Sequence, residues 1–341
     1  MAQVNKLAEA PSDGHSPVNQ ATDLGDDSSS SPVRAAEETT PSSPAPPQPV
    51  VTSWHVFLRT AKPSEIKERF VREVSEILKS EGAEAYCCLS LMEPDDSINT
   101  ADLDAIFSAL SSENAKHDKD ILLLLLCRGG SIEPAYQISK ICKVFAKNRF
   151  VVAVPRQAKS AATLIALGAD EIHMGPLGQL GPIDPQLGGL PALGVSQALE
   201  TIAGVAESHP GSAEMFARYL QLALTVEQIG YCDRISESAV QYATRLLSTK
   251  PQLVQKASSI ARELVHEYKD HGFVIDIEEA RRHLGADWIK SDTSEVRAAE
   301  RIYSLFESVN LVLDISQSKR IFVMGSVIDA SAIRVVKSRS R

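Results

Sequence analysis

The sequence predicts an α/β fold in which a parallel sheet is followed by a mostly helical C-terminal part. Residues 121–127 and 150–154 are continuous apolar runs of strand length, a pattern typical of strands that are buried on both faces. Segments with the apolar spacing of amphipathic helices separate these runs. This alternation indicates parallel βαβ units with right-handed crossovers, and such sheets carry their functional site at the carboxyl ends of the strands.

The elements of the core follow from local patterns along the chain. A helix begins at Pro63 and keeps apolar residues at 3.6-residue spacing until Glu81-Gly82 ends it. Thr100 is expected to cap the next helix. The helices expected in the core cover residues 63–80, 101–111, 134–146 and 160–167, and the strands cover residues 86–92, 121–127, 150–154 and 172–174.

The second half of the chain has the apolar spacing of helices almost throughout. Its expected helices cover residues 195–207, 211–223, 236–248, 251–269, 278–284 and 292–310. A last strand is expected over residues 321–324.

These elements give four parts. Residues 1–50 contain no aromatic residue and are rich in Pro, Ser, Asp and Glu, so they bury too little apolar surface to offset chain entropy. We predict a disordered acidic tail there, either passive or used for docking, and a short basic tail over residues 331–341. Residues 51–190 are expected to form the α/β core, and residues 191–330 a helical extension that packs on it.

Composition and charge exclude several classes of protein. Among the 341 residues, 43% are hydrophobic, and the formal net charge is −9 at pH 7. Because phosphate binding requires a basic face, this charge argues against a nucleic-acid partner. No apolar run approaches the roughly 20 residues that span a bilayer, and residues 1–10 lack the pattern of a signal peptide. We therefore expect a cytoplasmic protein with no membrane span.

The chain has five cysteines, an odd number, and none forms a C-x-x-C pair. This usage indicates reduced core residues of an intracellular protein, with a catalytic cysteine as the alternative. The cysteines are Cys87, Cys88, Cys127, Cys142 and Cys232. Neither metal-ligand spacing nor a phosphate-binding loop stands out, so no metal or cofactor is expected.

Two strand ends carry residues suited to acyl transfer. Gly129-Gly130 follows one strand, and glycine lets the backbone turn sharply with amide N–H groups that can hold an oxyanion. Ser160 begins the next short helix among small residues, where free N–H groups and the helix dipole favour negative charge. Taken alone, the glycines also fit an ordinary turn, and Ser160 also fits a helix N-cap.

Taken together, three segments resemble the serine dehydrogenase proteinase family, a relative of Clp-type serine proteases and signal-peptide peptidase A. The segments are Arg128-Gly129-Gly130, Ala158-Lys159-Ser160-Ala161-Ala162-Thr163 and Leu180-Gly181-Pro182-Ile183-Asp184-Pro185-Gln186. The resemblance covers residues 84–190 well and continues only loosely to residue 290. It implies Clp/crotonase-like stacked ββα units, assembly into a homo-oligomer, and a hydrolase that acts on a polypeptide.

The resemblance also implies roles for individual residues. Ser160 would be the nucleophile of a serine peptidase that works through an acyl-enzyme. Gly130 and Ala161 would supply the amides of the oxyanion hole, and Gly129 would permit the turn. Related sequences more often have glycine where this chain has Ala162, a change of one methyl group inside a helix.

The general base that a serine nucleophile needs is not assigned by these motifs. Clp-type relatives use a histidine about 25 residues after the serine, where this chain has Asp184 as a base, an orienting group or a turn residue. Membrane-associated relatives use a lysine, but no lysine lies between Lys159 and Lys250. Lys159 itself adjoins the serine, and consecutive helical side chains diverge. Lys250 and His271 stay candidates if the helical part, or a neighbouring subunit, brings them to the cleft.

Three hypotheses of function follow. The leading one is a serine peptidase whose extended substrate pairs with the chain after Gly130. A crotonase-like enzyme that stabilises thioester enolates of acyl-CoA with the same amides is a second. The missing base also suggests a catalytically inactive Clp-like scaffold or binding protein.

Overall fold

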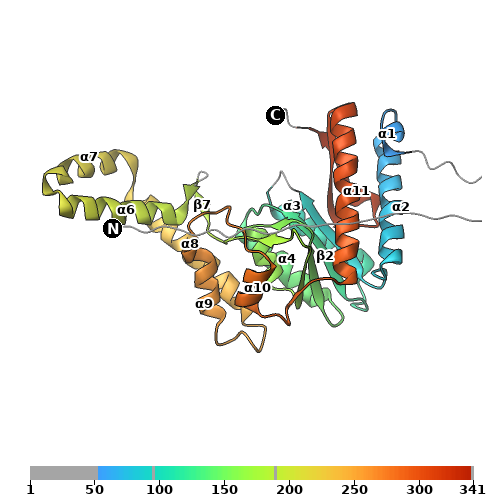
Figure 1. Ribbon diagram of the computed structural model, residues 1–341, viewed down its shortest axis with the longest axis horizontal. Coiled ribbons are helices and arrows are strands. Elements are labelled where there is room, and N and C mark those ends of the chain that lie inside the picture. Colours follow the sequence, from blue (N-terminus) through green and yellow to red (C-terminus); the bar gives the residue numbers. More distant parts are fainter. Residues whose placement is uncertain (1–52, 94–96, 188–189, 339–341) are drawn as a thin grey trace, which may run out of the picture. The chain divides into compact units, whose positions relative to one another are not determined.

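A mostly parallel sheet of nine strands lies at the centre of the computed structural model, which describes residues 53–93, 97–187 and 190–338 (Figure 1). Its main path runs β11-β10-β1-β2-β3-β5-β9, and the short strands β4 and β6 extend it beside β2. The bounds are β1 Cys87–Glu93, β2 Ile121–Cys127, β3 Phe150–Val154, β4 Gln157–Ala158, β5 Glu171–Met174, β6 Gln179–Leu180, β9 Ile289–Lys290, β10 Lys319–Ser326 and β11 Ile333–Lys337. Strands β7 Gln186–Leu187 and β8 Leu190–Pro191 form a separate antiparallel pair.

Helices cover both faces of this sheet. Helices α2 and α11 lie side by side over one face, while α3, α4 and α5 cover the other (Figure 1). The bounds are α1 Trp54–Phe57, α2 Pro63–Ser80, α3 Thr100–Glu113, α4 Ile132–Phe145, α5 Ala161–Leu167, α6 Ala192–Ser208, α7 Ala213–Ala223, α8 Val226–Leu247, α9 Ala257–Arg262, α10 Ile277–Leu284 and α11 Ser294–Gln317. Short 3-10 turns occupy Pro210–Ser212 and Ala330–Ala332, and a π-helical turn occupies Glu263–Glu267.

Strand β2 is the centre of the core. Its alternate side chains enter two different apolar clusters, with Leu123 and Leu125 facing α3, α4 and α5, and Leu122 and Leu124 facing α2 and α11. The strand therefore has no solvated face, which is why its sequence is continuously apolar instead of alternating. Its parallel pairing with β1 and β3 confirms the predicted α/β fold.

Most local predictions for the core hold. Helix α2 and strands β2 and β3 have the bounds that the apolar spacing predicted. The cap of α3 is different: the side chain of Asn99, not that of Thr100, accepts a hydrogen bond from the Ala101 amide at 2.8 Å. The helix consequently begins one residue earlier than expected.

The C-terminal part differs from the prediction in two ways. Strand β9, which the sequence did not predict, joins the main sheet, whereas β10 contains the strand expected over residues 321–324. Residues 333–337, expected in a basic tail, form β11 and pair antiparallel with β10. Ile333 is buried there and Val335 packs against the α2–α11 cluster, an alternation that the neighbouring basic residues obscure in the sequence. The acidic tail predicted for residues 1–50 lies outside the described residues.

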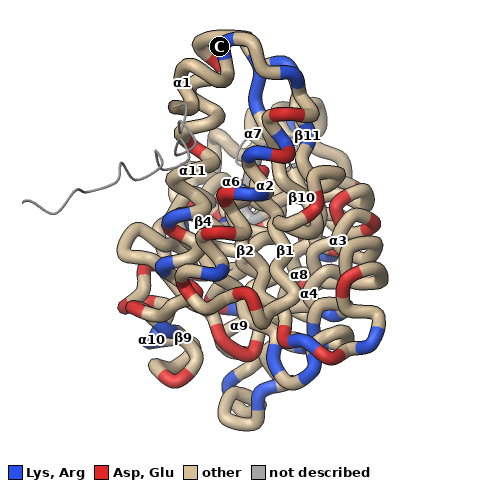
Figure 2. The backbone as a smooth tube through the Cα atoms, turned by 90° about the vertical axis from the view of Figure 1, so that its right-hand side faces the viewer, with Lys and Arg blue, Asp and Glu red and all other residues tan. Residues whose placement is uncertain are grey.

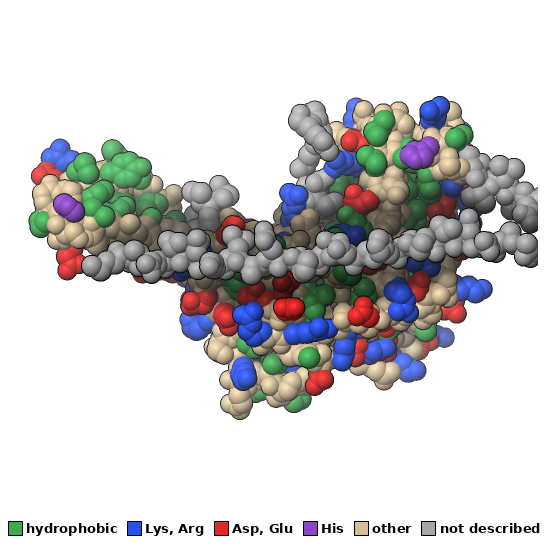
Figure 3. All heavy atoms as spheres, viewed as in Figure 1, with side chains coloured by type: hydrophobic (Ala, Val, Ile, Leu, Met, Phe, Trp, Pro, Cys, Tyr) green, Lys and Arg blue, Asp and Glu red, His purple; other side chains and the backbone are tan. Residues whose placement is uncertain are grey.

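Helices α6 and α7 project from the rest of the described structure, and hydrophobic side chains gather on them (Figures 1 and 3). Met215, Tyr219 and Leu222 of α7 are all exposed. Acidic and basic residues are interspersed over the sheet and its covering helices (Figure 2). Within the described ranges, every helix is too short or too polar to cross a membrane.

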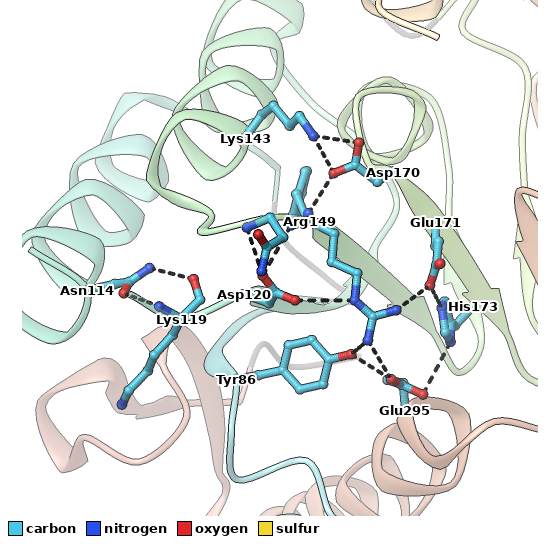
Figure 4. Close-up of polar contacts among 12 residues, drawn as sticks. Tyr86, Asn114, Lys119, Asp120, Lys143, Arg149, Asp170, Glu171, His173 and Glu295 are labelled. Carbon is cyan, nitrogen blue, oxygen red and sulfur yellow. Dashed lines mark hydrogen bonds and ion pairs between the residues drawn. The ribbon is translucent and has the colours of Figure 1, made fainter. Parts of the chain in front are cut away.

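A polar network ties the amino ends of the parallel strands together (Figure 4). Arg149, which precedes β3, binds Asp120 at 3.3 Å and Glu171 at 3.0 Å, and donates to the Tyr86 hydroxyl at 2.6 Å. Glu295 of α11 accepts a hydrogen bond from the same hydroxyl at 2.7 Å. This network holds together the amino ends of the strands, which lie opposite their carboxyl ends.

Candidate active site

A cavity of about 500 Å³ lies at the carboxyl end of β2, as the strand order predicts. Residues from six separate stretches of the chain line it. They are Ser97, Arg128, Gly129, Gly130, Ser131, Ile132, Glu133, Ser160, Pro185, Gln186, Tyr231, Ile235 and His271. The cavity thus joins the predicted nucleophile and glycine turn with one of the predicted bases.

Ser160 has a strained backbone. It connects β4 to α5 with φ 51° and ψ −119°, close to a conformation that glycine dominates in type II′ turns. Its side chain forms no capping hydrogen bond, although it occupies the N-cap position of α5. A strained serine that does not cap its helix has its hydroxyl available for another purpose, and such strain is concentrated at functional sites.

The glycine turn packs directly against this serine. Gly129 has φ 118°, and a Cβ atom at that position would lie 2.7 Å from the Ser160 Cβ and 3.2 Å from the Ala161 nitrogen. Gly130 has φ 149°, and a Cβ there would lie 2.3 Å from the backbone nitrogen of Ile98. Both positions therefore require glycine, for backbone conformation and for space.

The two expected oxyanion-hole amides are both available. Ile98 pairs with the chain on one side of Gly130, because its N–H donates to the Gly129 carbonyl and its carbonyl accepts from the Ser131 N–H. Gly130 lies between the two residues that bond to Ile98, so in this extended chain its N–H points to the opposite side. Ala161 is the first residue of α5, where amides have no partner inside the helix. Neither amide donates to another residue of the described ranges.

His271 and Asp184, which the motifs left as separate candidates, form a pair. The imidazole Nδ1 lies 2.6 Å from Asp184 Oδ1. The Asp184 side chain is 6% exposed and that of His271 is 31% exposed, so the carboxylate sits behind the ring. Gln186 Nε2 donates to the second carboxylate oxygen at 3.0 Å. The Asp184 hydrogen bond raises the pKa of His271 above its ordinary value.

Lys250 lies elsewhere. Its Nζ donates to the Gly168 carbonyl at 2.9 Å, at the C-terminal end of α5, while Ser160 precedes the N-terminal end. The seven residues of α5 separate these two ends by roughly 10 Å. The structure therefore places Ser160 and His271 on one cavity, with Asp184 bound to His271, and leaves Lys250 at the far end of the helix.

Two further residues are used structurally. Lys159 Nζ is directed at the Leu180, Gly272 and Phe273 carbonyls. His173 is buried in β5, where its ring lies within hydrogen-bonding distance of the Thr293 hydroxyl and of Glu171, whose contact Figure 4 shows.

The cysteines lie in the core. All five are free and buried. Burial raises the pKa of the Cys127 thiol, the one nearest the glycine turn, to about 12. Such a thiol is protonated at neutral pH and is a poor nucleophile. Across the described part of the chain, no group of three His, Cys, Asp or Glu side chains is arranged to hold a metal ion.

Comparison with known proteins shows what this chain is similar to. Two uncharacterized proteins of Methanocaldococcus jannaschii are similar in sequence. One is 30% identical over 210 residues, which cover 62% of this chain and 65% of the relative. The other is 38% identical over 81 residues, which cover 24% of this chain and 27% of the relative. The chain thus spans about two thirds of the first relative's length and about a quarter of the second's.

Several solved structures are similar at low identity. The 1510-N membrane-bound stomatin-specific protease matches at 15% identity with a TM-score of 0.39, over 74% of this chain and 92% of that one. The same protease in complex with a substrate peptide matches at 16% identity with a TM-score of 0.39, over 74% of this chain and 88% of that one. ClpP1 from Listeria monocytogenes matches at 13% identity with a TM-score of 0.38, over 65% of this chain and 98% of that one.

The family comparison covers most, but not all, of the residues that line the cavity. Residues 96–212 match the model of a family described as ClpP-like SDH-type serine proteinase. This stretch includes the glycine turn, Ser160 and Asp184, and it ends before His271. Over residues 96–212 the chain is therefore similar to the ClpP-like SDH-type serine proteinases, the family that its motifs resemble.

Proposed function

We propose that the protein is a serine peptidase that uses Ser160 as nucleophile, His271 as general base and Asp184 as the residue that orients the base. The observation that carries this proposal is the 2.6 Å contact between His271 Nδ1 and Asp184 Oδ1. His271 also lines the same cavity as Ser160. A nucleophile, a base and a group that orients the base are the parts of a serine hydrolase triad.

The first half of the reaction forms an acyl-enzyme. The Ser160 Oγ attacks the carbonyl carbon of the scissile peptide bond while His271 Nε2 accepts the hydroxyl proton. Asp184 accepts the hydrogen bond from Nδ1, which fixes the tautomer that leaves Nε2 free to accept. When the C–N bond breaks, the imidazolium returns the proton to the departing amine.

The charge of the tetrahedral intermediate falls on the former carbonyl oxygen. The amides of Gly130 and Ala161 form the oxyanion hole, a role supported by the packing of Gly129 against Ser160 and Ala161 and by the position of Ala161 at the start of α5. In the second half, water attacks the acyl carbon, and His271 accepts its proton. Breakage of the ester bond then returns the proton to Ser160.

An extended polypeptide fits this site as substrate. Ile98 occupies one side of the glycine turn, and the Gly130 N–H and C=O are directed to the other. An added substrate strand would pair there through main-chain hydrogen bonds. A homo-oligomer and a cytoplasmic location stay predictions from the sequence, and light scattering of the purified protein tests the first.

A fluorophosphonate probe tests the proposal, since it reacts with activated serines. The wild type should be labelled, and Ser160→Ala and His271→Asn should not be. Lys250→Met, whose lysine lies at the far end of α5, is the matched control and should be labelled like the wild type. Cleavage of unfolded casein should follow the same order.

Two other results identify the alternatives. A folded wild type that is neither labelled nor proteolytic at any pH between about 5 and 10 would overturn the peptidase proposal and favour a scaffold. Saturable acyl-CoA binding that is lost in Gly130→Ala would favour a crotonase-like enzyme that uses the same amides.

A further inference from the structure

The side chain of Lys159 is buried beside the nucleophile and does not point to it. Lys159 is 8% exposed, and its ammonium lies within hydrogen-bonding distance of three backbone carbonyls. These are Phe273 at 2.7 Å, Leu180 at 3.2 Å and Gly272 at 3.3 Å. A lysine ammonium has three N–H donors and no acceptor, so this convergence of carbonyls satisfies it fully.

The three carbonyls belong to the two segments that carry the rest of the triad. Leu180 lies four residues before Asp184, and Gly272 and Phe273 directly follow His271. The backbone of Lys159 itself precedes Ser160 and is fixed to the end of β2 by a 3.0 Å bond to the Cys127 carbonyl. One side chain therefore connects the segments of all three proposed catalytic residues.

The segment of His271 has few contacts that fix it to the core. Residues 271–274 are all partly or fully exposed, with Phe273 at 42% and Val274 at 51%. Its local bonds, from the Gly272 and Phe273 amides to Asp270, shape a turn but do not attach that turn to the core. Attachment comes from Lys159, from the His271–Asp184 hydrogen bond, from the ring contact between Phe273 and Tyr268 and, further along, from the bridge between Ile275 and Leu180.

The chain makes room for this lysine at a specific position. A Cβ atom on Gly181 would lie 2.5 Å from the Lys159 Cδ, so the lysine stem passes over a glycine. Thr163 of α5 holds that glycine from behind, because its hydroxyl accepts from the Gly181 N–H at 3.0 Å. Glycine at 181 is thus explained by the path of the side chain above it.

From this geometry, and resting on the proposed peptidase function, we infer that Lys159 is a positioning residue that holds His271 in register with Asp184 and Ser160. It does so as a protonated ammonium bound to the Leu180, Gly272 and Phe273 carbonyls. It is not the base, because all its donors are directed away from the nucleophile into the adjoining backbone.

The pKa of His271 can distinguish a positioning role of Lys159 from a simple effect of its positive charge. Asp184 and Asp270 raise the pKa of His271, burial lowers it, and the positive charge of Lys159 lowers it. Removing the lysine charge alone would therefore raise this pKa. Releasing the His271 turn would instead weaken the Asp184 hydrogen bond and bring the pKa down towards the ordinary value of about 6.5.

The experiment measures the His271 pKa by NMR titration of histidine side chains in the full chain, with His271→Asn to assign the signal. In Lys159→Met the pKa should fall towards that of Asp184→Asn. Gly181→Ala, which displaces the lysine but keeps its charge, should lower it too. The control Lys250→Met removes another buried lysine that binds a carbonyl, and it should leave the His271 pKa unchanged.

Kinetics give a second readout. Lys159→Met should lower kcat by about 100-fold with KM little changed, as expected of a misplaced catalytic group. An unchanged or higher His271 pKa in folded Lys159→Met and Gly181→Ala would overturn the inference. Should Lys159→Met fail to fold, Gly181→Ala alone decides. Because the NMR measurement needs no turnover, it tests the inference even if the wild type proves inactive.

Discussion

The imidazole Nδ1 of His271 lies 2.6 Å from Oδ1 of Asp184, although the two residues are 87 positions apart in the chain. Asp184 sits where Clp-type relatives have their histidine, and His271 comes from a turn between the π-helical segment and α10. The carboxylate is the buried partner and the imidazole is the exposed one. In the proposed triad the orienting acid therefore occupies the usual position of the base, and the base approaches from the C-terminal half.

This pair makes activity depend on pH in a defined direction. The Asp184 hydrogen bond raises the pKa of His271 above 6.5, and imidazolium cannot accept the Ser160 proton. We expect kcat/KM to rise with pH through a midpoint above 6.5. In Asp184→Asn the midpoint should move to lower pH, and the plateau should fall by about 10²–10⁴-fold. A pH profile of peptide hydrolysis checks both, and an unchanged midpoint would contradict the assignment of His271 as base.

The glycine turn should tolerate no side chain. In Gly129→Ala the new Cβ would lie 2.7 Å from the Ser160 Cβ, which pushes the nucleophile and the Ala161 amide out of place. We expect at least about a 100-fold loss in the rate of fluorophosphonate labelling. Gly204→Ala is the matched control, because a Cβ there has nothing within 4 Å and α6 continues through it. It should label normally and be more stable by about 0.5–1 kcal/mol.

How much the sequence predicts depends on how local each signal is. Strands β2 and β3 were predicted to the residue because burial on both faces leaves an uninterrupted apolar run. The glycine turn and Ser160 were found because their constraints, positive φ and close packing, act on residues adjacent in the chain.

The proposed general base was not singled out from the sequence, because its partner is distant in the chain. His271 and Lys250 were equal candidates in the sequence, and only the folded chain shows that one reaches the cavity while the other binds the end of α5. The available signal was a histidine between Asp270 and Gly272 in a polar turn, off any helix. Lys159 was considered only as a base, since nothing local indicates the carbonyls that it binds.

Strain at Ser160 should appear as lost stability. Its φ of 51° costs about 1–3 kcal/mol for a residue with a Cβ atom, and glycine adopts this conformation freely. Ser160→Gly should therefore unfold at higher urea concentration than the wild type, by about 1 kcal/mol in the free energy of unfolding, while losing all activity. Ser160→Ala removes the hydroxyl but keeps the strain. If the two variants proved equally stable, the strain assigned to this position would be wrong.

The Arg149 network should matter for stability and not for catalysis (Figure 4). Arg149→Met would leave Asp120, Glu171 and Glu295 close together without their shared cation. The arginine side chain is 41% exposed, so solvent screening reduces the loss to about 1–3 kcal/mol in the free energy of unfolding. Urea denaturation measures it. Because the network lies at the amino ends of the strands, kcat/KM should not change.

The control for this prediction is an exposed ion pair that contributes little to the free energy of unfolding. Arg218 binds Glu214 at 2.6 Å one helical turn away, and both side chains are 78% exposed. Arg218→Ala should change the free energy of unfolding by less than about 0.5 kcal/mol, because exposed pairs of this kind are screened by water and salt. Equal effects of Arg149→Met and Arg218→Ala would mean that the strand ends are held by the apolar core alone. A fall in kcat/KM for Arg149→Met would instead show that the network at the amino ends of the strands affects the proposed active site at their carboxyl ends.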